Sequence, residues 1–366
     1  MRIPFLPLFL LILSPLWGIA TTAQNNTAIE ALSRLKGLDL DASPALKGAV
    51  LKILATTRGT PQFVDIVRDF KLADQGVGLL ECAVLHPTHS SGAEAMRLLA
   101  AQGQIPLITA ALTGTNAAIV LTVLGNTGEK QFVPLLKPFI TDPQRGINLK
   151  KVALHSLTQT PEGTRHLLEM VRSDQLSADL KPTAMTVLNQ VRWSDLKAEA
   201  AKLLPVPQVQ DAQPLPPIAD LLKQTGNPTW GALVFQRAEV GCSLCHQVDG
   251  KGMDFGPKLS EIGTKLGKDA LYQSILEPSA GISFGFEAWQ LDLKNGDEAY
   301  GIISSETAED VALKTQNGIV TKYEKSNIAH RQQMTSSIMP SGLEHTMSPQ
   351  DLVDLIEYLM TLKKKG

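Results

Sequence analysis

A short cysteine and histidine motif constrains this 366-residue chain more than any other feature. Cys242 and Cys245 are separated by two residues, and His246 follows directly. The pattern Cys-x-x-Cys-His is the attachment signal for a c-type haem, in which both thiols bond to the haem and the imidazole ligates the iron. The second half of the chain is therefore predicted to fold around one covalently attached haem c, with His246 as a metal ligand.

Two other uses of a Cys-x-x-Cys pair remain open on the sequence alone. A zinc site needs about four ligands, usually from two such pairs, but the sequence holds only one further cysteine, Cys82, in an apolar run typical of a buried helix. A redox dithiol of the thioredoxin kind typically lies in a βαβ unit, and no such pattern is apparent around the motif. Haem attachment is favoured over both.

The N-terminus has the pattern of a secretory signal peptide, predicted over residues 1–23. A positive start at Met1-Arg2 is followed by an apolar run over residues 3–17 and by small residues suited to cleavage. A membrane anchor is the alternative, although the run is shorter than the ~20 residues that span a bilayer. Bacterial c-type haem is attached after export, so we expect a periplasmic or otherwise exported protein, membrane-associated only if this segment is retained.

Charge and composition exclude some partners and favour others. The chain has 34 basic and 36 acidic residues, so it lacks the excess of positive charge that nucleic-acid binding requires. From Ile218 onward, acidic residues number 19 against 14 basic ones. This acidic half favours a protein partner with a basic surface. No acid–base pair or phosphate-binding loop is apparent, so the chain is not predicted to be an enzyme by itself.

A proline-rich segment at residues 205–217 predicts a boundary between two domains. Before it, residues 24–204 show apolar positions at three- and four-residue spacing with short polar breaks, which predicts helix after helix. Leu135-Leu136 recurs as Leu167-Leu168, 32 residues later, a period typical of stacked helical hairpins. This part loosely resembles HEAT-like repeats and is predicted to be an α-solenoid; an irregular helical bundle is the alternative.

Residues 218–366 resemble class I cytochromes c, and more closely the haem-binding domains of planctomycete and verrucomicrobial proteins. The resemblance begins with a glycine and an aromatic residue four positions apart, Gly231 and Phe235, just before the haem motif. In the family such a helix packs against the C-terminal helix, here predicted at Gln350 to Leu362. The segment Gly256-Pro257-Lys258-Leu259 matches the Gly-Pro-x-Leu that follows the haem helix. The resemblance implies that the Pro257 carbonyl accepts a hydrogen bond from His246.

The resemblance also implies a sixth iron ligand from a loop ahead of the final helix. Met339 is the strongest candidate, because it precedes a proline and lies shortly before the helix start signal Ser348-Pro349. A thioether ligand raises the reduction potential. Competing ligands, or an open site, are not excluded by the sequence. The competitors are Met253, His330, Met334, His345 and Met347.

The stretch between the motif and Met339 is longer than a haem crevice requires and changes character at residues 284–328. Four segments alternate or carry β-forming residues, with turn signals at Asn295-Gly296 and Asn317-Gly318. They are Phe286 to Leu293, Ala299 to Ile303, Val311 to Lys314 and Ile319 to Tyr323. A small antiparallel sheet inserted into the haem domain is predicted, as in the planctomycete-type domain.

Together these patterns predict a mainly α protein, with an α-solenoid followed by an all-α cytochrome c fold that carries the small β insertion. The predicted function is one-electron transfer by an exported monohaem cytochrome, with the helical repeats as a docking surface for a redox partner such as a periplasmic dehydrogenase or another cytochrome. Two other functions remain open. The chain could be a haem-based ligand sensor or a structural scaffold with an auxiliary haem.

Overall fold

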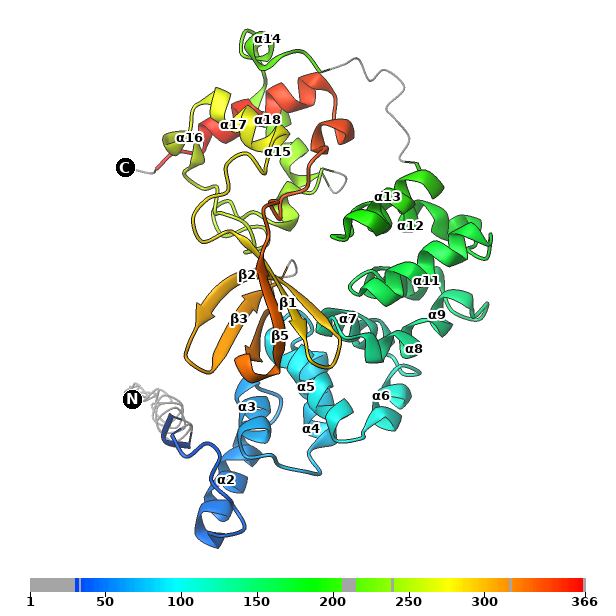
Figure 1. Cartoon of the computed structure of the whole chain (residues 1–366), viewed down its shortest axis with the longest axis vertical. Coiled ribbons are helices and arrows are strands. Elements are labelled where there is room, and N and C mark those ends of the chain that lie inside the picture. The colour runs from blue at the N-terminus through cyan, green and yellow to red at the C-terminus, as the bar shows by residue number, and fades with distance from the viewer. Residues whose placement is uncertain (1–29, 33, 206–214, 238–239, 316–317, 365–366) are drawn as a thin grey trace, which may run out of the picture. The chain divides into compact units, whose positions relative to one another are not determined.

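The computed structural model describes residues 30–32, 34–205, 215–237, 240–315 and 318–364 (Figure 1). The chain divides into two compact units, the first ending at Cys82 and the second beginning at Ala83. The predicted signal peptide, residues 1–23, lies outside the described residues, as does most of the proline-rich segment. The domain boundary predicted at 205–217 therefore stays a prediction. Each unit is described by itself.

The described part of the first unit holds the short helices α2 (Pro44–Thr56) and α3 (Pro61–Asp69) and the beginning of α4 (Gly76–Leu85). Both α2 and α3 begin with a proline. Proline suits the first turn of a helix because the N–H that it lacks would have no partner there. The Ser43 hydroxyl caps α2 by accepting a hydrogen bond from the Leu46 amide.

The second unit opens with a series of short helices. They are α5 (Ser90–Ala101), α6 (Ile105–Ala111), α7 (Ala117–Thr127), η1 (Lys130–Phe132), α8 (Val133–Leu136), α9 (Pro138–Thr141), α10 (Ile147–Leu157), α11 (Pro161–Arg172), η2 (Ala178–Leu180), α12 (Lys181–Asn189) and α13 (Ser194–Leu203). Contacts join α5 to α7, α7 to α10 and α11 to α13. The Ser156 hydroxyl on α10 donates to the Leu121 carbonyl on α7 at 2.9 Å, which satisfies a buried polar group inside this apolar stack.

The C-terminal helices surround α18, which runs from Pro349 to Thr361, within one residue of the predicted bounds. The others are α14 (Ile218–Leu221), α15 (Pro228–Gln236), η3 (Cys242–Leu244), α16 (Ile262–Lys265), α17 (Lys268–Leu276) and η5 (Leu343–Thr346). Ser348 and Asp351 form a capping box at the start of α18.

Helix α15 crosses α18 at very close range. A Cβ atom at Gly231 would lie 1.9 Å from the Asp354 carbonyl oxygen, so only glycine fits there. One turn away, the rings of Phe235 and Tyr358 pack at 5.7 Å between centroids. The predicted contact of these two helices, with glycine at the crossing, is present in the structure.

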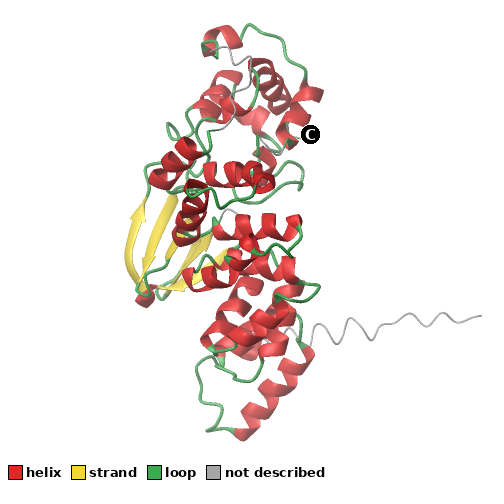
Figure 2. Ribbon diagram, turned by 90° about the vertical axis from the view of Figure 1, so that its right-hand side faces the viewer, coloured by secondary structure: helices red, strands yellow, loops and turns green. Residues whose placement is uncertain are grey.

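A five-stranded antiparallel sheet lies between α17 and η5 in the sequence and forms one layer of strands (Figure 2). The strands are β1 (Ala288–Leu293), β2 (Glu298–Glu306), β3 (Asp310–Lys314), β4 (Val320–Glu324) and β5 (Ile328–Gln333), in the order β4-β3-β2-β1-β5. The buried side chains of Leu291, Ala299, Val311 and Leu313 form its own small core.

The predicted fold class, a mainly α protein whose second half is an all-α cytochrome c fold with a small β insertion, is wrong. The protein is about 53% helical and 10% strand, and its second half holds a five-stranded sheet rather than a minor insertion into a helical fold. Strand β5 was missed, and the insertion extends beyond its predicted end at residue 328. The reason is physical: β5 is an edge strand with mostly exposed, polar residues, Ile328–Gln333, so it lacks the apolar alternation that marks a half-buried strand.

Within the second unit, the turn after β1 and the start of β2 contact helices from the first half of the chain. The Lys130 amide donates to Asp297 at 3.1 Å, and the Trp193 indole donates to Glu298 at 3.0 Å. The Arg192 guanidinium lies 4.6 Å above the Trp193 ring and 3.5 Å from the same glutamate. Cation–π and charge-assisted contacts together fix the sheet against these helices.

Candidate haem-attachment site

The Cys-x-x-Cys-His motif forms one tight turn after α15. Residues Cys242–Leu244 form the short helix η3, and the amides of Cys245 and His246 both donate to the Cys242 carbonyl, at 3.2 and 2.9 Å. This turn carries both thiols and the imidazole on one short stretch of backbone. A single planar group could therefore be held by all three side chains.

The His246 ring is fixed by the segment that follows the motif. Its Nδ1 atom lies 2.7 Å from the Pro257 carbonyl oxygen, the contact that the resemblance implies. A carbonyl can only accept, so Nδ1 carries the proton and Nε2 is left with a lone pair for a metal. Burial lowers the pKa of His246, and the hydrogen bond to Pro257 opposes this effect only in part. The net lowering of the pKa favours the neutral imidazole that can bind a metal.

Gly256 lets the loop backbone lie directly on the imidazole. A Cβ atom at this position would fall 2.7 Å from Cε1 of His246, which is too close for any side chain. The amides of Phe255 and Gly256 donate to the Cys245 carbonyl at 3.1 and 2.7 Å. The glycine in Gly-Pro-x-Leu is thus needed for close packing, a role that the sequence analysis did not assign to it.

The two thiols are half-buried and electrically neutral. Burial raises the pKa of Cys242 and that of Cys245 to about 11 each. A redox dithiol depends on a thiolate with a lowered pKa, so these neutral thiols disfavour that alternative. Among the residues that the structure describes, no three histidine, cysteine, aspartate or glutamate side chains form a group that could hold a metal ion.

Met339 lies on a half-buried loop beside the same apolar cluster as Cys242. This C-terminal core consists of buried side chains from α14 to α18, and both residues pack against it. The Met339 amide donates to the Ser337 hydroxyl at 3.1 Å, and the Ser337 amide donates to Ser279 at 3.0 Å. The first attachment thiol and the predicted thioether ligand thus border one apolar region, as a shared apolar cofactor would require.

The competing ligands differ in environment. Met347 is buried in the C-terminal core, with 6% of its surface exposed. The His345 side chain is 82% exposed, and His330 lies on edge strand β5, 3.4 Å from Asp292. Met253 and Met334 are half-buried on loops. Met339 remains the candidate, because it combines partial exposure with a place on the core.

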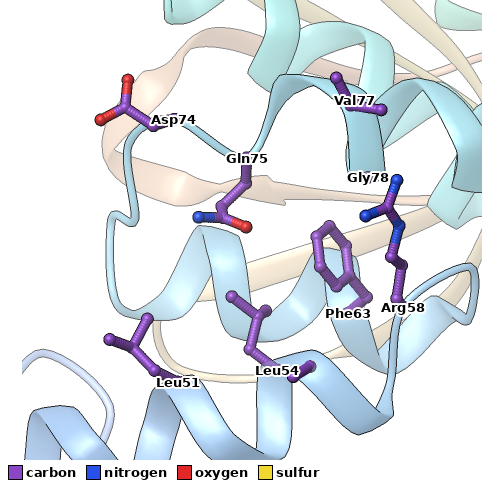
Figure 3. Close-up of a pocket in the computed structure, with 9 residues that line it drawn as sticks. Leu51, Leu54, Arg58, Phe63, Asp74, Gln75, Val77 and Gly78 are labelled. Atoms are coloured by element: carbon purple, nitrogen blue, oxygen red, sulfur yellow. The ribbon is translucent and has the colours of Figure 1, made fainter.

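A cavity of about 310 Å³ lies elsewhere, in the first unit (Figure 3). Leu51 and Leu54 of α2 and Phe63 of α3 line it, with Gln75 opposite. Its one cationic lining residue, Arg58, is paired with Glu81 at 2.6 Å. Asp74 is the one carboxylate of this lining, and the described lining residues place no second carboxylate, histidine or cysteine beside it there.

Comparisons with known proteins supply no family. No family model matches the chain, and no curated protein matches it as a relative. Across the described ranges, no helix has both the length and the apolar character to cross a membrane. The functional argument therefore depends on the motif and its geometry.

Proposed function

We propose that this protein is an exported c-type cytochrome that carries one haem and transfers single electrons. The observation that supports this most directly is the bond between His246 Nδ1 and the Pro257 carbonyl, on a turn that also carries Cys242 and Cys245. A redox dithiol would need a thiolate of lowered pKa, and a zinc site needs about four ligands, more than this turn supplies. When bound, the haem supplies reversible one-electron chemistry.

The chain's own residues hold and tune that group. Cys242 and Cys245 are the attachment points, His246 offers Nε2 to the metal, and the Pro257 carbonyl strengthens this imidazole as a donor. Met339 is proposed as the second axial ligand. The C-terminal core keeps water away from one side of the site, and low polarity limits the reorganisation that electron transfer requires.

The proposed partner is a redox protein of the cell envelope, either a dehydrogenase or another cytochrome. The haem half is the acidic half of the chain, which favours a basic docking surface on that partner. The helices before the proline-rich segment are proposed to contribute to docking. The chain is proposed to act as a carrier and not as an enzyme by itself.

The experiment is a pyridine haemochrome spectrum of protein made in a host that matures c-type cytochromes. The unmodified chain is expected to give the spectrum of haem joined by two thioether bonds. Cys242→Ala and Cys245→Ala should each shift the band toward that of a singly attached haem or lose most of the haem, and the double variant should bind none covalently. A Cys82→Ala control should match the unmodified protein. Denatured protein that releases all its haem into acidified organic solvent would contradict the proposal.

A further inference from the structure

An ion pair connects the sheet to the segment that orients His246. Lys314, the last residue of β3, places its ammonium group 3.0 Å from a carboxylate oxygen of Asp254. The two side chains are 24% and 47% exposed. Sixty residues separate them in the sequence, so the contact exists only because β3 reaches the loop that follows the motif.

A second contact joins the sheet to the same loop. Gly318, in the turn that follows β3, lies against Met253, since a Cβ atom on this glycine would be 3.3 Å from the methionine sulfur. The turn is closed by the Thr315 amide, which donates to the Ile319 carbonyl at 2.8 Å. The end of β3 and its turn thus touch two consecutive loop residues, Met253 and Asp254. An exposed ion pair alone would contribute little, whereas one backed by packing can hold a loop.

The loop of residues 253–257 is hydrogen-bonded to the motif through its backbone. The Met253 amide donates to the Ser243 carbonyl at 2.9 Å. The amides of Phe255 and Gly256 both donate to the Cys245 carbonyl. The following residue is Pro257, whose carbonyl accepts from His246. A shift at residue 254 would therefore change the distance between the Pro257 oxygen and the imidazole.

We infer that Lys314 is a positioning residue for the proposed haem site, acting through Asp254 on the Pro257–His246 hydrogen bond. The inference rests on the proposed function. A strong Nδ1–H···O bond gives the imidazole more anionic character and favours the oxidised metal. Loosening the loop weakens that bond, so the reduction potential is expected to rise.

The sheet that carries Lys314 is itself held in place by contacts with other parts of the second unit. At its other end, Asp297 and Glu298 are bonded to Lys130 and Trp193 of the helices. Strand β3 pairs with β2 on one side and β4 on the other. Lys314 therefore projects from a strand that is held on both flanks, so its position is set by the sheet rather than by the loop.

The test compares Lys314→Met and Asp254→Asn with Lys314→Arg and with Lys322→Met, a change of an exposed lysine on β4. Each full-length variant is matured with haem, and two quantities are measured: the reduction potential and the exchange rate of the His246 Nδ1 proton by NMR. Lys314→Met and Asp254→Asn should raise the potential and speed exchange a few-fold, and should do so to a similar extent. Lys314→Arg and Lys322→Met should leave both near the values of the unmodified protein.

The outcomes separate this inference from the proposed function. If the unmodified protein carries covalent haem but neither Lys314→Met nor Asp254→Asn moves the potential or the exchange rate, the positioning role is refuted while the cytochrome assignment stands. If Lys314→Met does not fold, Asp254→Asn decides the matter alone. If the unmodified protein carries no haem, the proposed function fails first, and the inference fails with it.

Discussion

Replacing Met339 with alanine is expected to abolish the weak far-red absorption band of iron–sulfur ligation and to lower the reduction potential sharply. A thioether stabilises ferrous iron, and axial ligands set haem potentials over a range of roughly 0.8 V, so loss of this ligand should move the potential by a sizeable part of that range. The vacated position should also let the ferrous protein bind carbon monoxide. Absorption spectra and a redox titration measure all three effects.

Met347→Leu is the matched control for this change. Met347 is buried in the C-terminal core, where leucine conserves the volume and costs less than about 1.5 kcal/mol. The far-red band and the potential should be retained in this variant. If the band persists in Met339→Ala but disappears in Met347→Leu, then Met347 is the ligand and the assignment of Met339 is wrong.

Gly231→Ala is expected to cause the largest loss of stability of any single added methyl group in residues 218–366. The new Cβ atom would lie 1.9 Å from the Asp354 carbonyl oxygen and 2.8 Å from Cβ of Tyr358, so α15 and α18 must move apart. Overpacking of this kind costs about 3 kcal/mol. Chemical denaturation followed by circular dichroism measures the change in the free energy of unfolding.

Gly281→Ala provides the comparison, because no atom lies within 4 Å of a Cβ atom built at that position. This variant should be neutral, or more stable by up to ~1 kcal/mol, since alanine restricts the unfolded chain. Equal stability of Gly231→Ala and Gly281→Ala would mean that the two helices do not cross as closely as described.

Local patterns in the sequence predicted much of the structure of residues 218–366. Four strands followed from alternation and Asn-Gly turns, the final helix from the signal Ser348-Pro349, and the contact between α15 and α18 from the resemblance. Each of these depends on residues that are close in sequence or match a known spacing. The motif likewise needed only five consecutive residues.

The errors and omissions concern features that depend on distant neighbours. Strand β5 is polar and forms because β1 offers it a free edge, which no pattern inside Ile328–Gln333 reveals. The pairs Lys314–Asp254 and Trp193–Glu298 join residues 60 and 105 positions apart, and a single sequence gives no signal for either.

The most direct measurement of the central claim is the intact mass of the mature protein purified from its native cells. A covalent cytochrome predicts a red protein whose mass, after denaturation, equals that of the processed polypeptide plus one haem, with the added mass on the peptide that contains Cys242 and Cys245. A colourless protein with the mass of the bare polypeptide would contradict the account.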